Sequence, residues 1–498
     1  MKPIRSRVVS NYAGQLWVAA LGLALLPRYL EILGPEAFGL VGVMYSLQAV
    51  ALVLDSGISV FIGREIAVRL ARPGDMRATR SLVHTFEVVV WLLAGLILAS
   101  LALAGVLLGP HILETQSIEV EDLQFSLLLV AASVALSWPS GYYAAALSGA
   151  ERQHALNALL AAFATLRYGG ALAVLYFPDA TVDYFLAWFA VSGLLQSLAM
   201  ALVFWRGFPQ PEAGKTFDLA GIRHGGAFAT GVFAVTALGI ATSQLDRALI
   251  SILMPLPALG MYVLVAGLGS GLGRIVQPLF NVVYPRMSQH AASGGRAELA
   301  ILYRASLELI TVLMAVAACV VAVLPDLVLL AWTGDKALAA ELAIPLALFF
   351  AGSAINGVLN IPYALHLSHA KTRTTLALNL VLLIAFVPVY LALIDAMGLA
   401  GAALGWLLLN LSAFAFMSYF GAARILPSAG LASHLGKLTF VVAAALAGAL
   451  LVHQFVPESP DRIAATCLVL AALAISGALA CLASQEARSQ LSRILRLT

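Results

Sequence analysis

Residues 28–40 read RYLEILGPEAFGL and residues 55–67 read DSGISVFIGREIA, and the chain between these two segments is almost entirely apolar. Pro35 cannot continue a helix that arrives from its N-terminal side, and Gly34 supplies a permissive turn. The apolar run that follows the turn is long enough to cross a bilayer. We therefore predict two membrane-spanning helices joined tightly at Gly34–Pro35.

Composition places the whole chain in the same class. Its 498 residues are 61% hydrophobic and only 11% charged, and the mean hydropathy is +0.95. A chain dominated by spanning helices has such values, and a soluble domain does not. The net charge of +3 is too small to indicate a nucleic-acid partner. The three cysteines lie in apolar runs without metal-ligand spacing, so we expect no metal and no cofactor.

Apolar runs cut by proline, glycine and charge clusters predict an all-α, polytopic membrane protein with about 14 transmembrane helices. We expect an N-terminal six-helix bundle over 1–205, a cytoplasmic linker over 206–224 and a C-terminal six-helix bundle over 225–420. Two additional helices and a cytoplasmic tail follow over 421–498. The predicted spans lie near 10–31, 37–67, 81–108, 123–148, 154–176, 182–205, 225–250, 257–285, 299–323, 338–365, 374–394, 398–420, 435–455 and 463–483.

The distribution of basic residues gives the expected orientation. Most Lys and Arg residues fall in loops on the side of the N-terminus, whereas the opposite side carries acidic loops such as ETQSIEVED at 114–122. Because basic loops stay in the cytoplasm, both termini are predicted to be cytoplasmic, which requires an even number of spans. We expect a multi-pass protein of the cell inner (cytoplasmic) membrane.

The sequence pattern of the opening hairpin also recurs after the linker, as an internal echo. A single shift in residue number aligns Gly39 with Gly260 and Glu65 with Arg286. The first pair marks the start of a long apolar helix in each half, and the second pair marks the end of that helix. Such an echo is typical of two parallel six-helix halves with a site between them.

Charged side chains inside the predicted spans are the candidate functional residues. A charge at the centre of a spanning helix costs about 2.5–3.5 kcal/mol on insertion scales, so it usually faces a partner or a polar cavity. Arginines stay charged and hold phosphate oxygens bidentately, which favours an anionic cargo such as a diphosphate. The candidates for binding the diphosphate or sugar are Arg28, Arg64, Arg167, Arg247 and Arg274.

Two of these arginines carry most of this argument. Arg167 and Arg274 lie mid-span, and we expect them to face one central cavity, whereas Arg28 is equally explained by a side chain that reaches the outer interface. The acids inside spans are candidates either for binding a coupling ion or for pairing with arginines, and the sequence leaves both roles open. These acids are Asp55, Glu87, Asp246 and Glu308.

The hairpin segments quoted above resemble the opening of polysaccharide repeat-unit flippases, including bacterial O-antigen flippases. These flippases belong to the multidrug/oligosaccharidyl-lipid/polysaccharide exporter superfamily. Asn11 and Gln15 in the first helix, and the helix that ends in YPRMS at 284–288, add to the resemblance. The resemblance implies two six-helix bundles around a central cavity that alternate between inward-open and outward-open states. It also implies a cargo of undecaprenyl-diphosphate-linked oligosaccharide, often driven by an ion gradient.

The same resemblance implies a role in surface polysaccharide biosynthesis, for a product such as lipopolysaccharide O-antigen or exopolysaccharide. The partners it implies are the lipid-linked oligosaccharide, membrane lipids, and the polysaccharide polymerase with its chain-length machinery, with no nucleic acid. The two extra C-terminal helices resemble the lipid II flippase branch.

Three alternative functions stay open. A multidrug exporter of the same superfamily is expected to have an acidic cavity, which the mid-span arginines disfavour. A lipid II flippase fits the helix count, but the full arginine set of that branch does not map onto this chain, which disfavours a peptidoglycan cargo. A membrane glycosyltransferase or polymerase needs a large outer loop or soluble domain, and no loop here is long enough. Because the sequence has no HExxH, GxSxG, CxxC or P-loop motif, we expect a protein that is not an enzyme.

Overall fold

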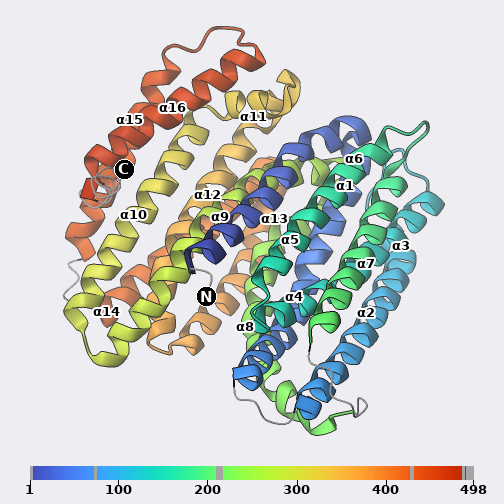
Figure 1. Ribbon diagram of the computed structural model, residues 1–498. Coiled ribbons are helices and arrows are strands. Elements are labelled where there is room, and N and C mark those ends of the chain that lie inside the picture. The colour runs from blue at the N-terminus through green and yellow to red at the C-terminus, as the bar shows by residue number, and fades with distance from the viewer. Residues whose placement is uncertain (1–3, 72–75, 209–216, 427–430, 485–487, 490–498) are drawn as a thin grey trace. The chain divides into compact units, whose positions relative to one another are not determined.

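The computed structural model describes residues 4–71, 76–208, 217–426, 431–484 and 488–489, and these residues are helical apart from short connections (Figure 1). The predicted linker is thus partly outside the described residues, as is the end of the tail. The chain forms two compact units, Met1–Met261 and Tyr262–Thr498. The division into bundles at residues 205, 224 and 420 stays a prediction.

The first unit contains eight α-helices, the start of a ninth and one wider π-helical turn among its described residues. They are α1 (Ile4–Ala71), α2 (Met76–Ile112), α3 (Val120–Ser137), α4 (Pro139–Gly149), α5 (Gln153–Ala164), the wide turn η1 (Thr165–Gly169), α6 (Gly170–Leu175), α7 (Val182–Gly207), α8 (Leu219–Leu253) and the beginning of α9 (Leu256–Ser293).

The second unit takes the rest of α9 and the remaining described helices. They are α10 (Arg296–Val323), α11 (Pro325–Thr333), α12 (Lys336–Ser368), α13 (Thr372–Ala415), the wide turn η2 (Phe416–Ala422), α14 (Ala423–Ile425), α15 (Leu431–His453) and α16 (Arg462–Ala483).

Two of these helices each consist of two helical segments joined at a glycine. Helix α1 is broken at Gly34, with φ 76° and ψ 166°, and α13 is broken at Gly398, with φ 57° and ψ −130°. Eleven stretches of the described chain are long and apolar enough to span a membrane, and two of them contain these breaks. Helix α8 covers the further predicted span at 225–250. The prediction of an all-α, polytopic membrane protein with about 14 spans is confirmed.

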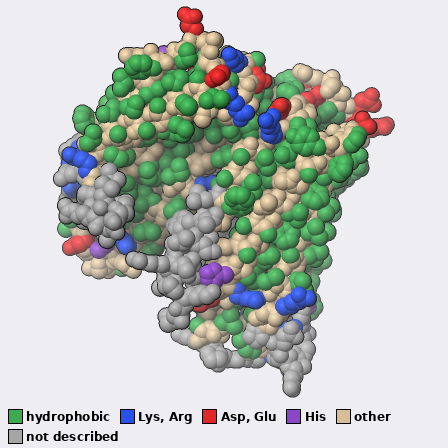
Figure 2. Space-filling view, turned by 45° about the horizontal axis from the view of Figure 1, so that its top comes forward, with side chains coloured by type: hydrophobic (Ala, Val, Ile, Leu, Met, Phe, Trp, Pro, Cys, Tyr) green, Lys and Arg blue, Asp and Glu red, His purple; other side chains and the backbone are tan. Residues whose placement is uncertain are grey.

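Helix α2 shows why the apolar runs form spanning helices. Its buried residues include Val83, Phe86 and Val90, which recur on one face, whereas Leu92 and Leu96 of the other face are more than half exposed. A helix that is apolar all round buries one face in protein and offers the other to lipid. Figure 2 shows the same pattern on the surface, where hydrophobic side chains cover the sides of the helices and charged ones gather near their ends.

The predicted hairpin at Gly34–Pro35 is present and is tied to its surroundings. The Glu36 carboxylate accepts hydrogen bonds from the backbone N–H groups of Gln116 (2.5 Å) and Ser117 (3.1 Å), which fastens the α2–α3 connection to the hairpin. Within the first unit, Gly39 lies against the backbone of Leu256, and Gly260 lies against the backbone of Pro35. The two glycines that the internal echo aligns are therefore both positions where helix backbones meet closely.

Helix α4 packs on α1 through small residues spaced four apart, namely Gly141, Ala145 and Gly149. A methyl group added at Gly149 would overlap the carbonyl oxygen of Gly63, and one added at Gly141 would overlap the Asp55 carboxylate. Small residues at this spacing let helix backbones approach closely inside a membrane. The chain enters α4 through the break between α3 and α4, where Trp138 Nε1 donates to the Ala51 carbonyl at 2.9 Å.

The two additional C-terminal helices pack inside the second unit. Val441 and Ala445 of α15 and Ala480 of α16 form one buried cluster with Val312 and Ala315 of α10. The Ser484 hydroxyl, just after α16, donates to Glu308 Oε1 of α10 at 2.6 Å. These apolar helices therefore extend the bundle from α10 outward, and between Lys437 and Ser484 their charged residues are limited to Glu458 and Asp461 in the connecting loop and Arg462 at the start of α16.

We predict that Gly34→Ala lowers the free energy of unfolding by about 1–3 kcal/mol, because its φ and ψ lie in a region that only glycine adopts without strain. The matched control is Gly95→Ala in α2, where the added methyl group meets nothing within 4 Å. That change should be neutral or stabilising by about 0.5–1 kcal/mol. Thermal unfolding of both purified variants in detergent checks this, and equal midpoints would contradict it.

Candidate functional site

The first unit contains a polar hollow among its helices. Its volume is about 350 Å³, and its walls come from the second half of α1, the α3–α4 break and the wide turn η1. The lining side chains include one carboxylate, one guanidinium, one amide and several hydroxyls, which is unusual inside an apolar bundle. Those polar side chains are Tyr45, Gln48, Asp55, Ser137, Ser140 and Arg167.

Two breaks in regular helix open this hollow. Helix α3 ends at Ser137 and α4 starts with Pro139, which lacks the N–H that would continue the ladder. The other break is the wide turn at Thr165–Gly169, which carries Arg167. Irregular backbone at membrane depth persists where it lines a cavity and its polar groups find partners. Here the Tyr29 hydroxyl donates to the Tyr168 carbonyl at 2.6 Å.

Arg167 is held from one side only. Its Nη2 donates to Gln196 Oε1 at 2.8 Å, and its guanidinium carbon lies 5.9 Å from the centre of the Phe189 ring. Its Nε is buried and has no hydrogen-bond partner among the described residues. Gln196 is itself buried, so this amide fixes the guanidinium against the wall formed by α7. The Gln196 bond uses one N–H group of the guanidinium terminus, and the other N–H groups there are left for a ligand in the hollow.

Asp55 is held on the wall of the hollow that α1 and α4 form. It is 8% exposed, and its Oδ1 accepts a hydrogen bond from the Ser59 hydroxyl at 2.5 Å. Its Oδ2 lies against Gly141, where no larger residue would fit without moving it. Within the described part of the chain, no ion pair joins Asp55 to Arg167, although both line one hollow. The hollow therefore holds two opposite charges that are not neutralised by each other.

Sequence reasoning named Asp55 but missed its polar neighbours in this hollow, Tyr45 and Gln48. Tyr45, Gln48 and Asp55 lie on one face of α1, because residues three, seven and ten apart recur on the same side of a helix. That spacing is visible in the sequence and was the available signal. Gln196 and Phe189, which position Arg167, come from another helix and carry no such signal.

The other arginine candidates lie elsewhere. Arg28 forms an exposed ion pair with Glu31 near the hairpin, in keeping with a side chain at the outer interface. Arg64 is exposed one turn before Arg69, which pairs with Glu65 at 3.0 Å. Arg274 is exposed on α9 in the second unit. The expectation that Arg167 and Arg274 share one cavity stays a prediction. The side chains of Asn11 and Gln15 lie outside the described residues.

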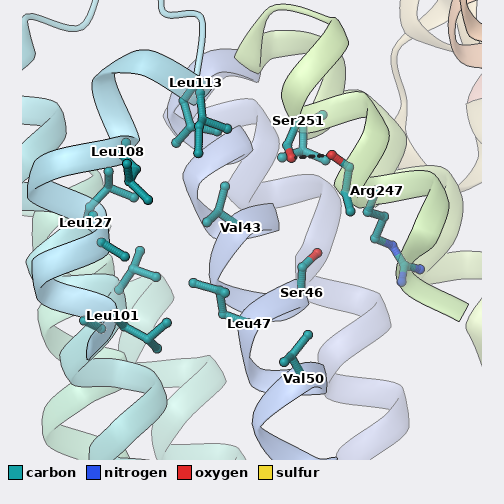
Figure 3. Close-up of a pocket in the computed structure, with 18 of the residues that line it drawn as sticks. Val43, Ser46, Leu47, Val50, Leu101, Leu108, Leu113, Leu127, Arg247 and Ser251 are labelled. Carbon is teal, nitrogen blue, oxygen red and sulfur yellow. Dashed lines mark hydrogen bonds between the residues drawn. The ribbon is translucent and has the colours of Figure 1, made fainter. Parts of the chain in front are cut away.

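Arg247 borders a second, mainly apolar cavity of about 300 Å³ in the first unit. Its Nη1 donates to Gln244 Oε1 at 2.8 Å, and its backbone N–H donates to the Asp246 carboxylate at 2.8 Å. Figure 3 shows leucine and valine side chains of α1, α2 and α3 facing this cavity. In the same view the Arg247 side chain extends along α8, and its guanidinium points away from Val43 and Leu47. This cavity is therefore mainly apolar, with Arg247 among its few polar lining residues.

Glu87 and Glu308, which were candidates for ion coupling or pairing, are both hydrogen-bonded. Glu87 Oε1 accepts from the Tyr143 hydroxyl and from Trp205 Nε1, each at 2.7 Å, and Oε2 lies 3.3 Å from His84 Nδ1. Glu308 accepts from Ser484. The described residues contain no group of three His, Cys, Asp or Glu side chains arranged to hold a metal ion.

The second unit has an apolar groove of its own. Its volume is about 380 Å³, and it lies among α10, α12, α13 and α15. Met314, Ile355, Phe414 and Leu438 are among the side chains that line it. One of the two additional C-terminal helices thus forms part of a hydrocarbon-lined wall.

Helix pattern and fold define the class of protein: a polytopic membrane protein with the fold of known flippases and transporters. The structure is similar to a lipid II flippase MurJ in an inward closed conformation, with a TM-score of 0.71 and 8% identity, over 96% of this chain and 98% of that one. It is also similar to an inward-facing multidrug resistance MATE family transporter of the MOP superfamily (TM-score 0.64, 12% identity, 83% and 94% covered). A Vibrio cholerae MATE transporter, VcmN, matches with a TM-score of 0.55 and 16% identity, over 86% and 97% of the two chains.

The sequence assigns the family. Residues 5–291 match the model of the family described as polysaccharide biosynthesis protein, which is more than half of the chain. The chain belongs to the polysaccharide biosynthesis protein family. The resemblance seen in the opening hairpin is thereby confirmed. No curated protein gives a significant match.

We expect Gln196→Met to lower the free energy of unfolding by about 1–3 kcal/mol, because it leaves a half-buried guanidinium without its buried amide partner. The matched control is Gln153→Met, which removes an exposed hydrogen bond to Ser148 and should cost less. Thermal unfolding of the two variants in one detergent measures the difference. If the two midpoints agreed, Gln196 would not support Arg167 in the way described.

Proposed function

We propose that the chain is a flippase that moves undecaprenyl-diphosphate-linked oligosaccharide repeat units from the inner to the outer leaflet of the cytoplasmic membrane by alternating access. Membership of the polysaccharide biosynthesis protein family and a fold shared with flippases and transporters support this proposal. The exported units then serve surface polysaccharide synthesis, as O-antigen or exopolysaccharide. The proposed role is transport, with no chemical step on the cargo.

The position of Arg167 in the polar hollow is the observation that most directly supports the proposal. A permanent cation in a hollow inside the bundle is costly unless an anion comes to it, and part of its donor capacity is unused. A guanidinium fork matches two phosphate oxygens, so a diphosphate is a natural ligand. Arg28, Arg64, Arg247 and Arg274 stay proposed contributors to cargo binding. Asp55, Glu87, Asp246 and Glu308 stay proposed sites of ion coupling or pairing.

The cargo's hydrocarbon tail needs an apolar surface as well. We assign it to the groove among α10, α12, α13 and α15, because its lining is almost wholly apolar and one wall comes from an additional C-terminal helix. The proposed location is the inner membrane with both termini in the cytoplasm, beside the polymerase and chain-length machinery.

A lipid II flippase is the second candidate function. The MurJ likeness extends over 96% of this chain, including the two additional helices, whereas the MATE likeness covers 83%. The polysaccharide family match favours an oligosaccharide cargo instead. A multidrug exporter is less well supported, because cationic drugs do not match a hollow that holds an arginine.

The test of the proposal is export of surface polysaccharide in the strain of origin after its gene is deleted and variants are supplied. Arg167→Ala should abolish polymer at normal protein level in the membrane, because it removes the only cation of the described hollow. Arg167→Lys should restore export partly, since an ammonium is a point charge without the bidentate fork. Lipid-linked repeat units should accumulate on the cytoplasmic leaflet.

The matched control is Arg69→Gln, which removes an arginine of α1 that pairs with Glu65 outside the hollow. Its polymer level should equal that of the wild type. Wild-type export from Arg167→Ala would contradict the role of Arg167. Accumulation of lipid II rather than of repeat units in the deletion strain would favour the second candidate function.

A further inference from the structure

We propose that the hollow between α1, α4 and η1 binds the junction between phosphate and the first sugar, with Asp55 as the residue that recognises the sugar. This inference rests on the proposed function and deepens it. Arg167 takes phosphate oxygens on one wall, and the Asp55 carboxylate accepts hydrogen bonds from sugar hydroxyls on the other. The ligand class is therefore a sugar phosphate, in which an anion and several donors are neighbours.

The two charged groups of the hollow, Asp55 and Arg167, are kept apart. Burying a carboxylate and a guanidinium is costly, and direct pairing is the usual way to recover part of that cost. Here the two groups line one hollow without forming an ion pair. A site that keeps them apart is complementary to a ligand that carries an anion and hydrogen-bond donors a few ångströms apart.

Each of the two charged side chains, Arg167 and Asp55, is fixed on its own wall of the hollow. Gln196 and Phe189 hold the guanidinium on the α7 side, at 2.8 Å and 5.9 Å. Ser59 and Gly141 hold the carboxylate on the α1–α4 side. Side chains that are fixed before binding lose little conformational freedom when a ligand arrives. The separation is therefore a built feature of the fold and is maintained without a ligand.

The Asp55 carboxylate has hydrogen-bonding capacity left for a ligand. An ionised carboxylate accepts at about four lone-pair positions, and the Ser59 hydroxyl takes one of them in Asp55. Gln48 and the Tyr45 hydroxyl add further polar groups to the same wall. Sugars present hydroxyl donors in a ring, so an acceptor-only group beside an amide suits them.

The volume of the hollow limits the size of its ligand. A hollow of about 350 Å³ lies at the lower end of the range of small-molecule sites, which run from about 300 to 1,000 Å³. It accommodates a phosphate and one neighbouring sugar, and it is too small for a whole oligosaccharide. The site thus recognises the part of the cargo next to the lipid and leaves the outer sugars free to vary.

The experiment measures equilibrium binding of short prenyl diphosphates to the full-length protein in detergent. One probe is the bare prenyl diphosphate, and three others carry one glucose, galactose or N-acetylglucosamine. We expect the wild type to bind at least one sugar-bearing probe about tenfold more tightly than the bare one, which is the effect of about one hydrogen bond to a charged group. Sugar 1-phosphates without lipid form a separate arm and distinguish a free metabolite from a lipid-linked ligand.

Two variants test the role of Asp55. Asp55→Asn should remove the preference for the sugar-bearing probe and leave affinity for the bare diphosphate within about twofold, which is less than one lost hydrogen bond. Gly141→Ala keeps every charge but displaces the Asp55 carboxylate, so it should give the same loss. The matched control is Asp183→Asn, whose carboxylate also accepts from a serine at 2.5 Å but lies outside the hollow. This control should keep the preference.

The outcomes separate the inference from the proposed function. Equal binding of all four probes to the wild type, or equal weakening of every probe by Asp55→Asn, would overturn the inference while leaving diphosphate transport intact. No binding of the bare prenyl diphosphate and no effect of Arg167→Ala on any probe would contradict the proposed function itself. Tighter binding of sugar 1-phosphates than of lipid-linked probes would overturn the lipid-linked ligand.

Discussion

The constraint on which this structure depends is the cost of placing a charge in an apolar bundle. Asp55 is buried and Arg167 is half-buried, and each is stabilised by a neighbour other than its opposite charge. The bundle leaves a hollow between them instead of closing on an ion pair. A fold optimised only for stability would replace both by apolar side chains. Their presence is explained by a ligand that brings the missing partners.

The backbone irregularities follow from the same constraint. Pro139 and Trp138 interrupt the helix that faces Asp55, and the wide turn at Thr165–Gly169 presents Arg167. The wide turn is satisfied from another helix, because the Tyr29 hydroxyl donates to the Tyr168 carbonyl, and the α3–α4 break is tied to α1 because the Trp138 indole donates to the Ala51 carbonyl. Glycine at position 141 then brings α4 against the Asp55 side chain. The hollow is a consequence of these few positions and does not require a special fold.

Much of the fold follows from the sequence, and less of the site does. Gly34 and the apolar runs predict the helices, because proline, glycine and charge mark where an apolar segment must end. The depth of Arg167 predicts a polar surrounding. Its actual neighbours, Gln196 and Phe189, depend on how α7 packs, which no periodicity within one helix reveals. Arg247 shows the converse, because a similar charge lies beside an apolar cavity and binds an amide of its own helix.

The central claim is that this chain moves a lipid-linked sugar diphosphate across a bilayer. The most direct measurement places the purified protein in vesicles with a fluorescent polyprenyl-diphosphate oligosaccharide and follows the accessibility of the sugar to an enzyme added outside. The account predicts that protein-containing vesicles re-expose inner-leaflet cargo after the outer pool has been consumed, and that vesicles with Arg167→Ala behave like protein-free ones. Equal rates with and without the protein would contradict the account.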